Sequence, residues 1–243
     1  MTRPPMIPLG SPAAGISVLF VAASLSAQAP SPLPDHIRFL QDTRIALQND
    51  RQSQSRYTYR EKRTETRLGG DGEVLARSVK VVDVNPAPPD GDATRRENEA
   101  IDEAFRIYDF RMIGRDRVDG YDAIHFTFSP APGVTPRTSE GKLLQKFSGR
   151  AWIAERDHQL IRFEAESIDD VSMGLGLLAR LYKGSRVVFQ RRQLSDGVWL
   201  PSEFRYSGGG RVLLVKKLRI EGIREYLDYQ PVFITASSAR SGK

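Results

Sequence analysis

Histidine is the side chain best suited to proton transfer near neutral pH, and this chain of 243 residues has three, His36, His125 and His158. No two of them stand four residues apart, the spacing that places two metal ligands on one face of a helix. His125 alternates with Ile124 and Phe126 in a predicted strand, which places it at the surface or at a sheet edge. We therefore predict no catalytic residue, no metal and no cofactor, and a hydrolase that uses His125 is the weakest functional alternative.

A glycine-rich apolar segment, DDVSMGLGLLARLYKGSRVVF (169–189), contains Gly174 and Gly176 in a G-x-G arrangement. A dinucleotide site needs such glycines between a strand and a helix. Here the segment leads into a predicted strand, so we exclude a phosphate-binding loop. Two interpretations stay open: the leucines form an apolar rim that contacts lipid or a helical lid, or they pack beneath the helices as ordinary core.

The elements that must position these residues are a few helices and many hairpins. Asp35 can cap a helix over 35–52, and an amphipathic pattern predicts a short helix within 98–107. A helical turn or two is expected at 142–147. Alternation with a period of two predicts about nine strands, with turn residues at 69–72, 119–120, 156–157, 196–197 and 208–210. Because strands do not alternate with long helices, we predict a mainly β (α+β) fold, an antiparallel sheet curled over helices.

Large aromatic residues recur along the predicted strands and can either fill a core or line a cavity for an apolar ligand. The candidate lipid-binding residues are these aromatics together with the leucines of the apolar segment: Trp152, Phe163, Leu175, Leu177, Leu178, Leu181, Phe189, Trp199 and Phe204.

The formal net charge of +6 favours acidic partners such as anionic lipid head groups or acidic proteins. The candidate contacts to an anionic partner are Arg60, Lys62, Arg63 and Arg67, in the first predicted hairpin. These side chains also allow peripheral contact with a membrane. Glutamates interrupt this run of basic residues, which argues against a nucleic-acid-binding surface. The alternative is that these charges are solvated strand ends beyond the core.

The first 29 residues have the three-part pattern of a secretory signal peptide, with Arg3, an apolar run and small residues ending at Ala29. Pro30 is unfavourable after a cut at Ala29, so a cut after Ser26 is an alternative, as is an uncleaved anchor. We predict a signal peptide over 1–29, a linker over 30–34, one domain over 35–231 and a flexible tail over 232–243.

The chain has no cysteine, which excludes disulfides and lipid modification of an N-terminal cysteine. The predicted location is the periplasm, and the expected state is a monomer.

The motifs G-x-A-W-I, L-x-R-x-E-A, G-L-G-L-L-A-R-L-x-K-G-S and G-V-W-L-P fall within residues 149–201. With their surroundings, about Tyr108 to Tyr229, they resemble exported, mostly uncharacterised bacterial proteins related to the LolA/LolB-like outer-membrane lipoprotein-sorting superfamily. The resemblance implies a curved, incompletely closed antiparallel β-barrel covered by two or three helices.

The same resemblance implies a binder or carrier of lipid or lipoprotein acyl chains in the periplasm, with envelope proteins as further partners and no enzymatic activity. No segment matches the cargo-binding motif of the carriers, so no binding residue is transferred from them. The alternative is a sensor or scaffold of the same fold that acts through protein contacts.

Overall fold

The structure is a computed structural model that describes residues 31–85, 91–173, 179–212 and 216–232. Contacts group the chain from Leu33 onward into one compact unit. The helices are α1 (His36–Gln54), α2 (Gly91–Ile107) and α3 (Ser139–Leu144). The strands are β1 (Tyr57–Leu68), β2 (Val74–Val84), β3 (Tyr108–Val118), β4 (Tyr121–Pro130), β5 (Phe147–Ala154), β6 (Leu160–Ser167), β7 (Val171–Met173), β8 (Ala179–Leu181), β9 (Arg186–Gln193), β10 (Trp199–Val212) and β11 (Lys216–Pro231). Within these ranges, no helix is long and apolar enough to cross a membrane.

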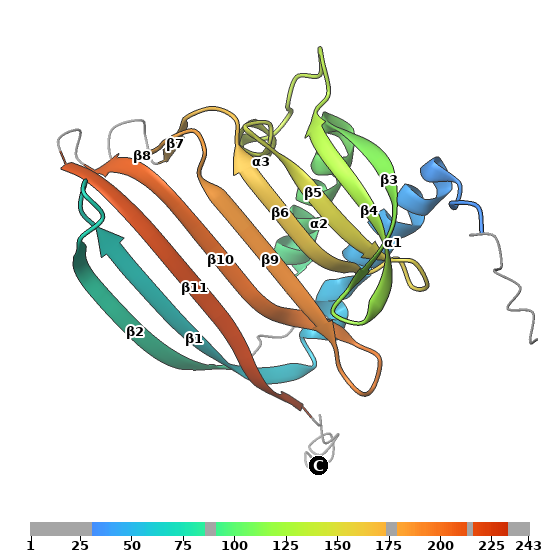
Figure 1. The fold of residues 1–243 in the computed structure, drawn as a ribbon. Helices are drawn as coiled ribbons and strands as arrows, with labels where there is room; N and C mark the ends of the chain where they lie inside the picture. The colour runs from blue at the N-terminus through green and yellow to red at the C-terminus, as the bar shows by residue number, and fades with distance from the viewer. Residues whose placement is uncertain (1–30, 86–90, 174–178, 213–215, 233–243) are drawn as a thin grey trace, which may run out of the picture. The chain divides into compact units, whose positions relative to one another are not determined.

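One antiparallel sheet dominates the fold, with the strand order β2-β1-β11-β10-β9-β6-β5-β4-β3 (Figure 1). The short strands β7 and β8 pair with each other outside this path, and β8 also pairs with β10. The outer strands β2 and β3 do not pair in this order, so the sheet curves without closing. The predicted fold class is confirmed: an incompletely closed antiparallel barrel with three helices.

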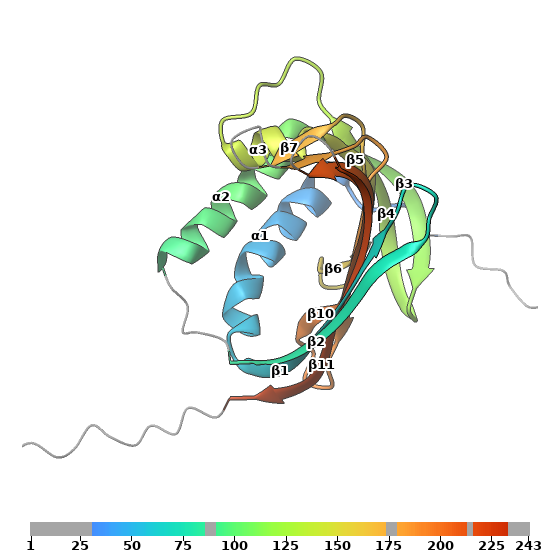
Figure 2. The same cartoon turned by 90° about the vertical axis from the view of Figure 1, so that its left-hand side faces the viewer.

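The helices lie on one side of this sheet (Figure 2). Phe39 of α1 packs into a buried cluster with Ile124 and Phe126 of β4 and with Ala151 and Ile153 of β5. These residues alternate along their strands, so one face of each strand meets the helices. The end of α2 and the start of β3, Ile107 and Tyr108, pack in a second cluster with Phe128 and Ala165.

Local sequence explains where several elements begin and end. The Asp35 side chain accepts a 2.8 Å hydrogen bond from the backbone N–H of Arg38, so it caps α1 as predicted. Asp119 and Gly120 both have positive φ, 52° and 87°, which a two-residue hairpin loop of type I′ requires. The helix α2 begins at Gly91, seven residues before the predicted segment. The prediction missed these first turns because they are polar and show no apolar residues at helical spacing.

Candidate functional site

A cavity of about 180 Å³ lies between the helices and the sheet, and we take it as the candidate site. All three helices and strands β3 to β6 contribute to its wall. Its lining residues are mostly aliphatic or aromatic: Leu40, Thr43, Leu47, Ala104, Phe105, Tyr108, Phe110, Phe126, Phe128, Leu144, Ala151, Ile153, Leu160 and Phe163.

The two hydroxyl groups among the lining residues both donate hydrogen bonds to backbone carbonyls. Thr43 Oγ1 donates a 2.8 Å hydrogen bond to the carbonyl of Phe39, one turn earlier in α1. The Tyr108 hydroxyl donates to the carbonyl of Leu144, and burial raises the pKa of this phenol. The cavity therefore offers apolar contact and no free hydroxyl, which suits a hydrocarbon guest.

The size of the cavity limits what it can hold. An engineered apolar cavity of about 150 Å³ stays dry and binds benzene, whereas sites for drug-sized ligands span roughly 300–1,000 Å³. A methylene group occupies about the volume of one water molecule, about 30 Å³, so about six of them fit here. Longer apolar guests require the helices to move away from the sheet.

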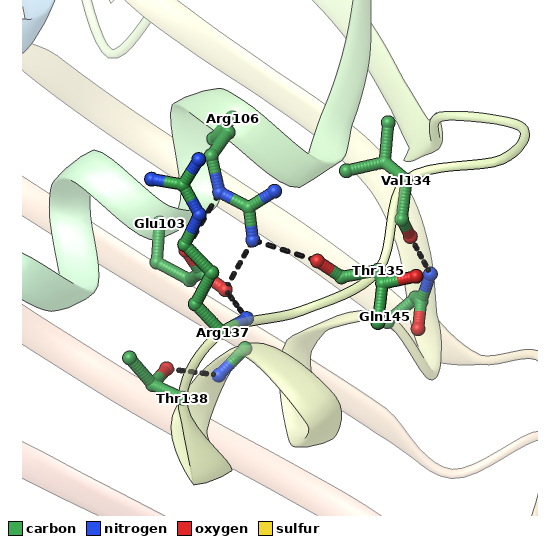
Figure 3. Close-up of polar contacts among 8 residues, drawn as sticks. Glu103, Arg106, Val134, Thr135, Arg137, Thr138 and Gln145 are labelled. Carbon is green, nitrogen blue, oxygen red and sulfur yellow. Dashed lines mark hydrogen bonds and ion pairs between the residues drawn. The ribbon is translucent and has the colours of Figure 1, made fainter.

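A buried carboxylate fastens α2 to the segment that leads into α3 (Figure 3). Glu103 is only 5% exposed. It accepts hydrogen bonds of 2.9 and 2.7 Å from the Arg106 guanidinium and one of 2.5 Å from the backbone N–H of Arg137. Arg106 also donates to the carbonyl of Thr135 at 2.9 Å. We call these four residues the Glu103 network.

The Glu103 network is charged at physiological pH. Hydrogen bonds from Arg106 lower the pKa of Glu103 to about 2, against the opposing effect of desolvation. The carboxylate also needs a glycine beside it: a Cβ at Gly141 would lie 2.5 Å from Glu103 Oε1. Thr138 caps the short helix here, with its hydroxyl accepting from the Gly141 N–H at 2.9 Å. The network thus holds α2 and α3 together over one end of the cavity.

A second polar contact joins α2 to α1. Asp102 Oδ1 accepts hydrogen bonds from Arg44 Nε at 2.7 Å and from Gln48 Nε2 at 2.6 Å. Asp102 and Glu103 both lie in the C-terminal half of α2. In the N-terminal half, Arg95 pairs with Asp92 and Glu99 of the same helix. The hydrogen bonds that Asp102 and Glu103 accept from residues outside α2 thus lie near the C-terminal end of this helix.

The predicted lipid-binding aromatics are divided between two places. Phe163 lines the cavity. It is the direct cross-strand partner of Phe189, which in turn is the partner of Phe204. Directly paired residues of antiparallel strands point to the same face. Phe189 and Phe204 therefore continue the apolar row from the cavity toward β10.

Trp152 faces away from the helices, because it pairs with His125, on the face of β4 opposite Ile124 and Phe126. It packs in another cluster together with Trp199, whose Nε1 donates to Asp157 at 2.8 Å. Leu181 in β8 pairs with Gly210 of β10, apart from the cavity lining. Leu175, Leu177 and Leu178 lie outside the described residues.

His125 stacks on Trp152 on that outer face. The ring centroids are 4.7 Å apart and the planes differ by 3°. Trp152 Nε1 donates to Asp116 at 2.8 Å, and the guanidinium groups of Arg150 and Arg162 lie over its ring. Burial lowers the pKa of His125, which favours the neutral imidazole.

The four predicted contacts to an anionic partner are all in ion pairs and lie on two faces of the sheet. On one face, Arg60 pairs with Asp83 and Asp228, and Lys62 pairs with Glu225. Arg63 and Arg67, at odd positions of the same strand, pair with Glu61 and Glu65. The structure therefore does not bring the four together as one patch.

Sequence reasoning missed most of the cavity wall. Ala104 and Phe105 carried a signal, since their helical spacing predicted an apolar face on the second helix. Leu40 and Leu47 likewise share one face of the predicted first helix. In the Glu103 network, the i,i+3 spacing of Glu103 and Arg106 was a possible signal. Thr135 and Arg137 had none, because they come from a loop whose position depends on the tertiary fold.

Searches with models of known protein families and against curated proteins give no match. Among solved structures, the chain is similar to a DUF1329-family protein from Desulfovibrio piger, at 12% identity and a TM-score of 0.35, over 82% of this chain and 95% of that one. It is also similar to a domain named for outer-membrane lipoprotein sorting from Vibrio parahaemolyticus, at 10% identity and a TM-score of 0.35, over 84% and 94% of the two chains.

A third similar structure is a LolA-superfamily protein from Nitrosomonas europaea, at 8% identity and a TM-score of 0.33, over 79% of this chain and 93% of that one. These names match the superfamily that the sequence motifs resemble.

Proposed function

We propose that this protein binds an acyl chain of a lipid or lipoprotein in the cavity between its helices and its sheet, and carries it through the periplasm. The observation that carries the proposal is the apolar cavity itself, whose two lining hydroxyls are both bonded to backbone carbonyls. The signal-peptide pattern supports the location. Catalysis is not part of the proposal.

The energetics suit a carrier that must release its cargo. Burial of a methylene group contributes roughly 0.8 kcal/mol, so six of them contribute about 5 kcal/mol before the cost of association. That amount corresponds to weak binding, since a micromolar complex needs about 8.2 kcal/mol. Tighter binding of a long chain requires the cavity to widen.

The test uses cis-parinaric acid, a fatty acid that fluoresces in apolar surroundings. Ala104 lines the cavity from α2, and Ala104→Leu places three more carbons inside it, about half of its capacity. We expect at least a tenfold loss of affinity, or about 1.4 kcal/mol. The matched control is Ala93→Leu, the same change in the same helix away from the lining residues. A folded Ala104→Leu protein that binds as well as the wild type would contradict the proposal.

A second candidate function, that of an envelope sensor or scaffold, is favoured by the outer strand β2. Among the strands that the structure describes, β2 pairs only with β1, and its Val79 and Val81 are 57% and 54% exposed. An open edge with exposed apolar side chains can accept a strand from a partner protein. Native mass spectrometry of protein isolated from cell envelopes separates the two functions: bound lipid supports the carrier, and a bound polypeptide supports the sensor.

A further inference from the structure

The apolar row that leaves the cavity ends in basic residues. Phe163, Phe189 and Phe204 are successive cross-strand partners on the helix-facing side of the sheet. The next partners in register are Arg224 of β11, Arg63 of β1 and Lys80 of β2. We call these three cations the basic end of the row. In Figure 1, strands β11, β1 and β2 lie to one side of the helices, so none of the described helices covers this part of the face.

The basic end carries an excess of positive charge. Glu61 pairs with Arg63 at 2.7 Å and lies 3.8 Å from Arg224 Nε. Lys80 makes no ion pair with any residue that the structure describes. Three cations around one carboxylate leave a net charge of +2. The nearby Glu65 is already paired with Arg67, so it does not cancel this excess.

The geometry places this charge at the border of the apolar surface. The Arg224 guanidinium lies over the ring of Phe204, 5.8 Å from its centroid. The side chains of Arg63 and Arg224 are 46% and 44% exposed, so both can reach a ligand from solvent. Three strand spacings separate Phe163 from Arg224, which is about 14 Å. One amphipathic molecule can therefore span the row with its head at the basic end.

We infer that the basic end binds the phosphate head group of a single-chain lipid whose acyl chain runs over Phe204 and Phe189 toward the cavity. This inference rests on the proposed function. Guanidinium groups match phosphate oxygens with paired hydrogen bonds, which favours phosphate as the head group. Glu61 acts as a positioning residue, since its carboxylate holds the Arg63 guanidinium through two hydrogen bonds of 2.8 and 2.7 Å.

The experiment compares three probes by calorimetric titration of the mature protein: a lysophosphatidic acid, the monoacylglycerol with the same acyl chain, and inorganic phosphate. We expect the lysophosphatidic acid to bind at least about tenfold more tightly than the monoacylglycerol. The variant Arg224→Gln/Lys80→Gln should lose this preference and keep its affinity for the monoacylglycerol. The matched control is Arg205→Gln/Arg77→Gln, which removes the same charge from the other face of β10 and β2.

The outcomes separate the two ideas. If neither acyl probe binds, the proposed function fails and the head-group site fails with it. If both acyl probes bind equally, the proposed function stands and the head-group site is refuted. Inorganic phosphate that binds as tightly as the lysophosphatidic acid would identify a site for free phosphate and overturn the lipid assignment.

A measurement on the wild-type protein alone tests the head-group site even if the variant misfolds. Raising the ionic strength from 0.01 to 1 M shortens the Debye length from about 30 to 3 Å. The preference for the lysophosphatidic acid should then shrink, because the basic end is half-exposed. A preference that does not change with salt would count against recognition by these charges.

Discussion

Filling the cavity from the sheet side should stabilise the protein and abolish acyl binding at the same time. Ala151 lines the cavity on β5 and is the direct partner of both Phe126 and Phe163. Ala151→Ile adds three carbons to this space. Isoleucine is also a residue that strands accommodate well, because its branched side chain packs on a pleated surface.

The expected gain follows from the space that is filled. Three buried carbons contribute about 2.4 kcal/mol at roughly 0.8 kcal/mol each. For a domain of this size, each kcal/mol shifts the melting temperature by about 2–4 °C, so thermal unfolding should occur roughly 5–10 °C higher. Circular dichroism measures the melting temperature, and fluorescence of cis-parinaric acid measures the loss of binding in the same preparation.

The result that refutes this reasoning is a drop in melting temperature. Overpacking of a filled core costs typically 1–3 kcal/mol, so destabilisation would mean that the space is already occupied. Unchanged binding by the stabilised variant would show that the acyl chain lies elsewhere. Ser148→Ile serves as the control, because Ser148 lies on the same strand and faces away from the cavity.

Two further predictions concern the supports of the site. The pKa of Glu103 is lowered to about 2 from an ordinary value of 4.5, so its contribution to stability is present above pH 4.5 and is lost as the pH falls toward 2. The melting temperature of Glu103→Gln should therefore be lower than that of the wild type at pH 7, and it should fall less between pH 4.5 and 2. The control Glu99→Gln changes an exposed residue, so its melting temperature should equal that of the wild type at each pH. A Cβ at Gly222 would lie 2.1 Å from Cζ of Tyr206, so Gly222→Ala should cost about 1–3 kcal/mol in urea unfolding. The cost should shrink in a Tyr206→Ala background, and equal costs in both backgrounds would show that this contact is not responsible.

Features that depend on neighbouring residues were predictable from the sequence. Asp119-Gly120 specifies its hairpin because glycine and aspartate tolerate positive φ, and Asp35 specifies the start of α1 because its carboxylate reaches a free N–H group. The division of Arg60 and Lys62 from Arg63 and Arg67 also follows from the period of two along a strand.

Features that depend on strand register were not predictable. The size of Trp152 suggests an inward position, yet the smaller Ala151 faces the cavity. Strand alternation places the indole on the other face, where Asp116 accepts its N–H and the guanidinium groups of two arginines lie over its ring. The row from Phe163 to Lys80 likewise joins strands that are far apart in the sequence, and only the pairing of β1 with β11 brings them together.

The unjoined strands β2 and β3 have a consequence for the range of ligands. In a closed barrel, the number and stagger of the strands fix the internal diameter. Here that constraint is absent, because the two outermost strands do not hydrogen-bond to each other in the strand order. The width of the interior is instead set by the distance between the helices and the sheet. Under the proposed function, substitutions in α1 and α2 would therefore change the size of the acyl chain that fits, and every strand pairing would stay intact.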